Sequence, residues 1–195
     1  MLGSRLPCVP TTLLDDSILR RYEEALRRVG AGIVEHWRPG LADAEIASLE
    51  QTHDIVLPEE ARRVWRWHDG CDPRAKPLAG IAPGRLFLPL AHVLEGYSAS
   101  VGATRQLYKM DRVISPFTAP PHIHFDCRGE SLAPVPILVD HDFEEPKQTL
   151  PSIAALFTTW TRFIETGLWR IQADGHWDFD YIDRLTDDII GLGVY

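Results

Sequence analysis

The spacing of hydrophobic residues changes along this 195-residue chain, and this change constrains its fold more than any other feature. Residues 13–70 show helical periodicity, in which apolar positions recur every three or four residues. Residues 86–140 contain short apolar runs typical of strands, and a helical pattern returns at 152–165 before a final hairpin pattern. Helices followed by strands predict an α+β domain in which a mostly antiparallel sheet packs against helices.

Helices are predicted where apolar periodicity coincides with residues that begin or end a helix. Pro58 suits a first turn because proline lacks a backbone N–H, and Gly30 and Gly167 suit helix ends. His68 is expected in the last turn of the helix that Pro58 begins, and Gly70 at its stop. The expected helices cover residues 13–29, 42–53, 58–70, 91–97 and 152–165, with a last one from Ile182.

Strands are predicted in the apolar runs between turn-forming residues. Residues 123–127 and 135–140 are expected to form a hairpin across the polar segment between them. A second hairpin is expected around Asp174-Gly175, because Asp-Gly favours a tight turn. The expected strands cover residues 86–90, 123–127, 135–140, 169–172 and 176–181.

Length and composition indicate one globular domain in the cytoplasm. A hydrophobic fraction of 45% and a charged fraction of 25% are those of a folded chain. No apolar run approaches the roughly 20 residues that a membrane-spanning helix needs, and residues 1–10 lack the apolar core of an export signal. Three widely spaced cysteines fit a reducing compartment better than a disulfide framework. The lack of asparagine and the scarcity of lysine indicate a GC-rich bacterial source.

The net charge of −8 arises entirely in residues 115–195, since basic and acidic residues balance before them. Such an acidic part repels phosphate and anionic lipid, which argues against nucleic-acid and membrane binding and allows a basic protein partner. A merely solubilising acidic surface is the alternative. The first acidic cluster is Asp140, Asp142, Glu144 and Glu145, and the second is Asp174, Asp178, Asp180, Asp183, Asp187 and Asp188.

The segment 37–70 resembles the SUKH superfamily, which includes bacterial immunity proteins against secreted toxins and relatives of fungal cell-wall synthesis regulators. In that family a WxPGL-type turn opens a helix with an I-x-x-x-E motif, and a second helix begins at Leu-Pro and ends near an Asp-Gly pair. The matching residues are Trp37, Pro39, Gly40, Leu41, Ile46, Glu50, Leu57, Pro58, Trp65, His68, Asp69 and Gly70. Residues 31–195 are then the SUKH-like domain, and residues 1–30 are an N-terminal helical extension.

The resemblance implies a protein-binding domain with no catalytic residues, no cofactor and no metal. Its expected partner is a basic, nuclease-type toxin that it neutralises by binding, and a regulatory scaffold without a toxin partner is a further alternative. Trp65 and Trp67 lie two apart on a predicted helix, so one of them is expected near the surface. The predicted contact residues are Asp140, Asp142, Glu144, Glu145, Asp178, Asp180 and Trp67.

A metal-dependent enzyme is the hypothesis from a different class. His122 and His124 are two apart on a predicted strand, so both imidazoles face one side, and His141 is a possible third ligand. Two surface histidines on an exposed strand face are the alternative. His68 and Cys71 resemble half of a zinc site, but no second pair at comparable spacing accompanies them.

Overall fold

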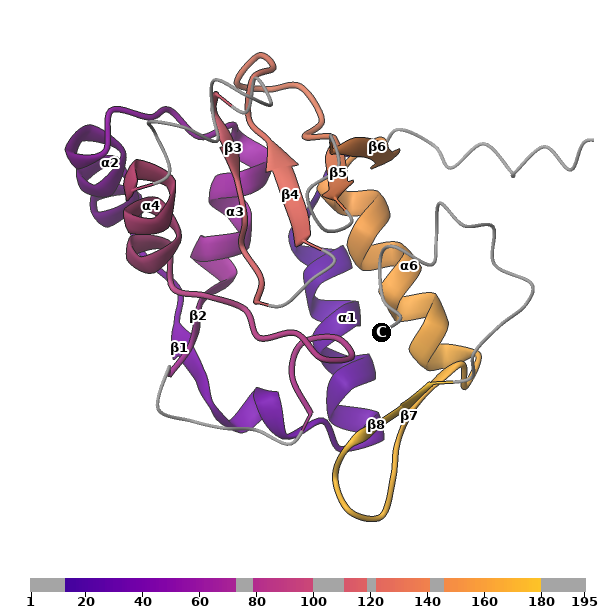
Figure 1. The fold of residues 1–195 in the computed structure, drawn as a ribbon. Helices are drawn as coiled ribbons and strands as arrows, with labels where there is room; N and C mark the ends of the chain where they lie inside the picture. Colours follow the sequence, from indigo (N-terminus) through magenta and orange to yellow (C-terminus); the bar gives the residue numbers. More distant parts are fainter. Residues whose placement is uncertain (1–12, 73–78, 100–110, 119–121, 141–145, 180–195) are drawn as a thin grey trace, which may run out of the picture.

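The computed structural model describes residues 13–72, 79–99, 111–118, 122–140 and 146–179 (Figure 1). The helices are α1 (Asp16–Val29), the 3₁₀ turn η1 (Gly32–Glu35), α2 (Asp43–Thr52), α3 (Glu59–Trp67), α4 (Leu90–Ala99) and α6 (Ile153–Glu165). The strands are β1 (Trp37–Pro39), β2 (His68–Cys71), β3 (Val113–Ile114), β4 (His122–Asp126), β5 (Ile137–Asp140), β6 (Lys147–Leu150), β7 (Trp169–Ile171) and β8 (Trp177–Phe179). The predicted α+β class is confirmed.

The core forms where α1 and α6 pack side by side (Figure 1). Tyr22 of α1 is fully buried and its ring lies 5.2 Å from Phe157 and 5.8 Å from Trp160 of α6. Its hydroxyl donates to the carbonyl oxygen of Ile81, which satisfies the one polar atom of the side chain. Helix α1, which belongs to the predicted N-terminal extension, therefore shares one hydrophobic core with the other described elements.

The largest sheet has four antiparallel strands in the order β3, β4, β5 and β6. The predicted hairpin of β4 and β5 is confirmed, with Ile123 opposite Val139 and Phe125 opposite Ile137. The hairpin of β7 and β8 around Asp174-Gly175 is also confirmed. The two outer strands, β3 and β6, were not predicted, because one is only two residues long and the other reads KQTL and is mostly solvent-exposed.

The predicted end of the third helix is wrong. Helix α3 ends at Trp67, and His68 and Gly70 belong to strand β2, which pairs with β1. Gly70 has a φ of 69°, and a Cβ there would lie 2.4 Å from backbone atoms of Leu88 and Pro89. The glycine is therefore needed for a close approach of two chain segments, and not for a helix stop.

The predicted strand at residues 86–90 does not form. Phe87 makes a single bridge to Phe117, and Leu90 already begins α4. Proline at position 89 has no N–H to donate to a ladder, which explains why the pairing stops there. The predicted helix from Ile182 lies outside the described residues.

Two further findings concern the compartment predictions. Cys71 and Cys127 are buried free thiols, and burial raises the pKa of Cys127 far above its ordinary value. No helix in the described ranges is long and apolar enough to cross a membrane.

Candidate functional site

Two acidic residues of the segment 37–70 hold the backbone of neighbouring elements. Glu50, at 6% exposure, accepts the N–H of Leu57 at 2.7 Å and forms a two-pronged ion pair with Arg62. This arrangement fixes the turn between α2 and α3. Asp69 accepts the N–H of Leu90 at 2.9 Å and pairs with Arg38 at 3.0 Å. Both carboxylates are nearly fully buried and already have partners within the fold.

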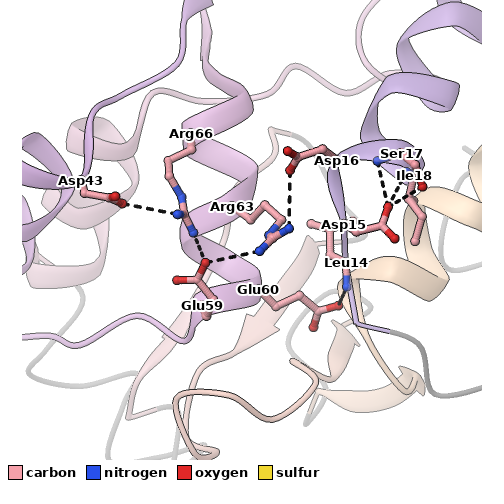
Figure 2. Close-up of polar contacts among 10 residues, drawn as sticks. All are labelled: Leu14, Asp15, Asp16, Ser17, Ile18, Asp43, Glu59, Glu60, Arg63 and Arg66. Atoms are coloured by element: carbon pink, nitrogen blue, oxygen red, sulfur yellow. Dashed lines mark hydrogen bonds and ion pairs between the residues drawn. The ribbon is translucent and has the colours of Figure 1, made fainter.

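A third buried carboxylate, Glu60 of α3, joins three segments that are distant in sequence. Its Oε1 accepts the N–H groups of Leu14 and Ala154, each at 3.0 Å, and its Oε2 accepts that of Val135 at 2.5 Å. Figure 2 shows Glu60 reaching the chain just before α1. Burial raises the pKa of Glu60, and the backbone N–H groups oppose that rise. The sequence did not predict this role, because Glu60 reads as an ordinary first-turn acid.

Strand β4, which carries His122 and His124, takes part in a mostly buried series of hydrogen bonds. Nδ1 of His124 lies 2.8 Å from the hydroxyl of Ser115, and Nε2 lies 3.0 Å from a carboxylate oxygen of Asp140. Because a carboxylate only accepts, Nε2 carries a proton, and in the neutral ring Nδ1 accepts the hydroxyl of Ser115. His124 is only 4% exposed, so the expectation of an exposed histidine pair is wrong for this residue. His122 is exposed as expected.

The hydrogen bonds among Ser115, His124 and Asp140 link three neighbouring strands, and these side chains do not line a described groove. Ser115 directly follows β3, His124 lies in β4 and Asp140 ends β5. The described grooves between α1 and α3, between α1 and α6, and between α2 and α4 are lined by other residues. We assign the hydrogen-bonded residues Ser115, His124 and Asp140 a structural role, which is to hold β3, β4 and β5 together.

Replacing Asp140 by asparagine is expected to destabilise the protein at neutral pH, and this destabilisation should shrink as the pH falls below about 4. The site is partly buried, which raises the pKa of Asp140, but the bonds from His124 and the nearby His122 outweigh this and lower it below the ordinary 3.8. The unfolded chain therefore binds the proton more readily, and this stabilisation disappears as the pH falls through the folded-state value. Urea unfolding of both proteins between pH 3 and 7 measures the difference, and a constant difference would contradict the assignment.

Two of the three histidines in the metal hypothesis lie within the described residues. The His122 and His124 rings lie 6.2 Å apart, and His141 lies outside the described residues. Both ring nitrogens of His124 already have partners, so a metal would have to displace Ser115 or Asp140. Among the described residues, no three side chains of His, Cys, Asp or Glu gather closely enough to hold a metal ion.

The predicted contact residues lie in different parts of the molecule. Asp140 is bound to His124, and 19% of its side chain is exposed. Asp178 lies in the β7–β8 hairpin with 41% of its side chain exposed, 3.7 Å from Arg170. Trp67 is the last residue of α3, and its ring packs against those of Trp37 and Phe157. The other predicted contacts lie outside the described residues: Asp142, Glu144, Glu145 and Asp180.

Trp67 lines an open groove of about 480 Å³ between α1 and α3, which we call the α1–α3 groove. Its lining is mostly charged and comprises Asp16, Leu19, Arg20, Glu23, Arg63, Arg66 and Trp67. The expectation that one of Trp65 and Trp67 lies near the surface is confirmed, since Trp65 is fully buried and Trp67 is half-buried. The arginines of this groove were not predicted as site residues, because charged residues on a helix read as a solvated face.

Glu23 anchors the aromatic side of the α1–α3 groove. Its carboxylate accepts the indole N–H of Trp67 at 3.1 Å and pairs with Arg27 at 2.6 Å and His68 at 3.4 Å. Burial raises the pKa of Glu23, but these bonds outweigh it and leave the pKa below its ordinary value. The Trp67 ring lies 4.7 Å from that of Trp37, edge to face, which further fixes its orientation.

An alternating chain of charges runs from α2 across α3 to α1 (Figure 2), and its members Asp16, Arg63 and Arg66 line the groove. Arg66 pairs with Asp43 at 3.5 Å and more closely with Glu59. Arg63 lies 3.6 Å from Glu59 and 3.5 Å from Asp16. The α1–α3 groove therefore offers ionic and aromatic contacts together.

A scan of the chain against protein-family models finds no match, and a search of curated proteins finds no significant relative. The resemblance of the segment 37–70 to the SUKH superfamily stays a prediction from its motifs.

Proposed function

We propose that this chain is a SUKH-like protein-binding domain without catalytic activity, and that it neutralises a basic, nuclease-type toxin by binding it. One observation carries the proposal: several of the reactive side chains that the sequence singles out are bound within the framework. Glu50 and Asp69 accept backbone N–H groups, and His124 is held between Ser115 and Asp140. Cys71 and Cys127 are buried. The accessible groove that Trp67 lines also contains arginines, and tryptophan and arginine are both enriched in protein interfaces.

The charge distribution supports a basic partner. The net charge of −8 comes from residues 115–195, and a nuclease must carry a basic surface to hold phosphate. Complementary charge accelerates association and orients the two proteins. Asp178, with its partly exposed carboxylate, is a described member of this acidic part. Asp140, Asp142, Glu144, Glu145 and Asp180 complete the proposed acidic contacts.

Trp67 supports a lasting contact. A half-buried tryptophan that is already held in place loses little conformational freedom on binding, and tryptophan is enriched among interface hot spots. The hydrogen bond to Glu23 and the edge-to-face contact with Trp37 supply that order.

We expect the protein, used as bait in a lysate of its native cells, to capture a basic protein that is released at high salt. The captured protein, once purified, should degrade nucleic acid, and an equimolar amount of this chain should stop the degradation. Mass spectrometry of the salt eluate and a plasmid-cleavage assay measure the two results. Capture of no basic protein, or undiminished cleavage in the complex, would contradict the proposed function.

A further inference from the structure

The α1–α3 groove has more hydrogen-bond donors than its own carboxylates satisfy. Arg20 is exposed and makes no ion pair with any described residue. The nearest carboxylate oxygens of Arg63 lie at 3.5 and 3.6 Å, whereas a guanidinium and a carboxylate in firm contact are separated by about 2.7–2.9 Å. The guanidinium groups of Arg20 and Arg63 can thus donate further hydrogen bonds to an acceptor in this groove.

The carboxylates in and near the groove, by contrast, either have partners within the protein or are exposed to water. Glu23 is shared by Arg27, Trp67 and His68. Glu59, which does not line the groove, is held closely by Arg66. Asp16 is 80% exposed on its side chain, so water and salt screen its charge. The α1–α3 groove can therefore bind an anion through Arg20 and Arg63, although the chain as a whole is acidic.

We infer that the α1–α3 groove receives an acidic side chain of the protein partner, whose carboxylate is bound by Arg20 and Arg63 beside Trp67. The inference rests on the proposed function for the identity of the partner. An arginine fork matches a carboxylate in two-pronged geometry, and the indole of Trp67 would contact the carbon atoms of the inserted side chain. A volume of about 480 Å³ accommodates a few side chains of one segment.

The partner must then carry an accessible carboxylate in addition to its basic surface. A metal-dependent nuclease combines a basic surface for phosphate with carboxylates that hold its catalytic metal ions. A partner of that class thus presents both signs of charge close together. The acidic residues of this chain would face the basic surface, and the α1–α3 groove would take a carboxylate.

The test uses the full-length protein and two capped peptides, acetyl-Gly-Glu-Glu-Gly-amide and its Gln-Gln counterpart. We expect the Glu peptide to shift the indole N–H resonance of Trp67 in a ¹⁵N spectrum, and the Gln peptide to leave it unchanged. Arg20→Gln and Arg63→Gln should each weaken Glu-peptide binding about tenfold, since each removes a charge-assisted bond. Arg28→Gln is the matched control, because Arg28 is an exposed arginine of α1 outside the groove.

Three results would overturn the inference: equal shifts with both peptides, equal weakening by the Arg28 control, or binding of inorganic phosphate without binding of the Glu peptide. The peptide experiment needs no toxin, so its outcome is separate from that of the lysate capture. Captured toxin with no peptide binding rejects the groove alone, and peptide binding with no captured toxin rejects the proposed function alone.

Discussion

Replacing Glu60 by alanine is expected to lower the free energy of unfolding by about 4 kcal/mol. The backbone N–H groups of Leu14, Val135 and Ala154 would lose their acceptor in a site that is only 3% exposed. Each buried donor without a partner costs roughly 1–3 kcal/mol, and water entering the space left by the side chain would recover part of that cost. Urea unfolding followed by tryptophan fluorescence measures the change.

Glu59→Ala is the matched control for this prediction. Glu59 also lies in the first turn of α3, but its side chain is 34% exposed and makes surface ion pairs with Arg63 and Arg66. Its loss should cost less than about 1 kcal/mol. If Glu60→Ala prevents folding, Glu60→Gln still gives a measurable value, because it keeps one acceptor oxygen. Equal stability losses at positions 59 and 60 would show that Glu60 does not join the three segments.

Reversing the charges of Asp142, Glu144 and Glu145 to lysine is expected to slow association with the toxin by about 10- to 100-fold at low salt. These residues belong to the acidic cluster whose attraction would steer a basic partner. Asp140 is left intact, because its carboxylate bonds to His124 and its loss would disturb the sheet. Stopped-flow or surface-binding kinetics against the captured toxin, at 20 and 500 mM salt, measure the association rate constant.

The control for charge reversal changes the net charge by the same amount elsewhere. Glu24, Glu35 and Glu95 are exposed residues of the charge-balanced part of the chain, and their replacement by lysine tests long-range attraction alone. We expect this second triple variant to retain most of the association rate. An unchanged rate in the first variant would rule out the cluster as the contact, and equal slowing in both would attribute steering to net charge.

The elements predicted correctly are those whose signals are local. Helix α6 carries Ser152 at its N-cap, where the side chain accepts the N–H of Ala155 at 3.0 Å, and its apolar face is continuous. The β7–β8 turn contains Asp174-Gly175, with Gly175 at a φ of 84°. In both cases a few neighbouring residues suffice to select the conformation.

The elements predicted wrongly depend on distant residues. His68 continues the periodicity of α3, but pairing with β1 draws residues 68–71 into a strand. Gly70 must pass close to Leu88 and Pro89, which are far along the chain. The outer strand β6 exists only because β5 offers it a hydrogen-bonding edge. Tertiary pairing overrides local preference at these positions.

For the candidate site, sequence reasoning identified Trp67 but could not identify its surroundings. The i and i+2 spacing of Trp65 and Trp67 was enough to place one of them near the surface. Nothing in the local sequence distinguishes Arg20 and Arg63, which face the α1–α3 groove, from arginines that face only solvent. The same holds for Ser115, whose bond to His124 depends on the adjacent positions of β3 and β4.

Sequence patterns are sufficient to predict the α+β class, most helices and the two hairpins, because periodicity, caps and turn residues act within a few positions. Which charged side chains are buried and which remain accessible depends on how the helices and strands pack together. Glu59 and Glu60 are adjacent and chemically alike, yet one lies in a surface ion-pair chain and the other holds three distant segments. The difference arises because helix packing turns one side of α3 toward the core, and a carboxylate there is stable only where N–H groups from elsewhere in the chain surround it.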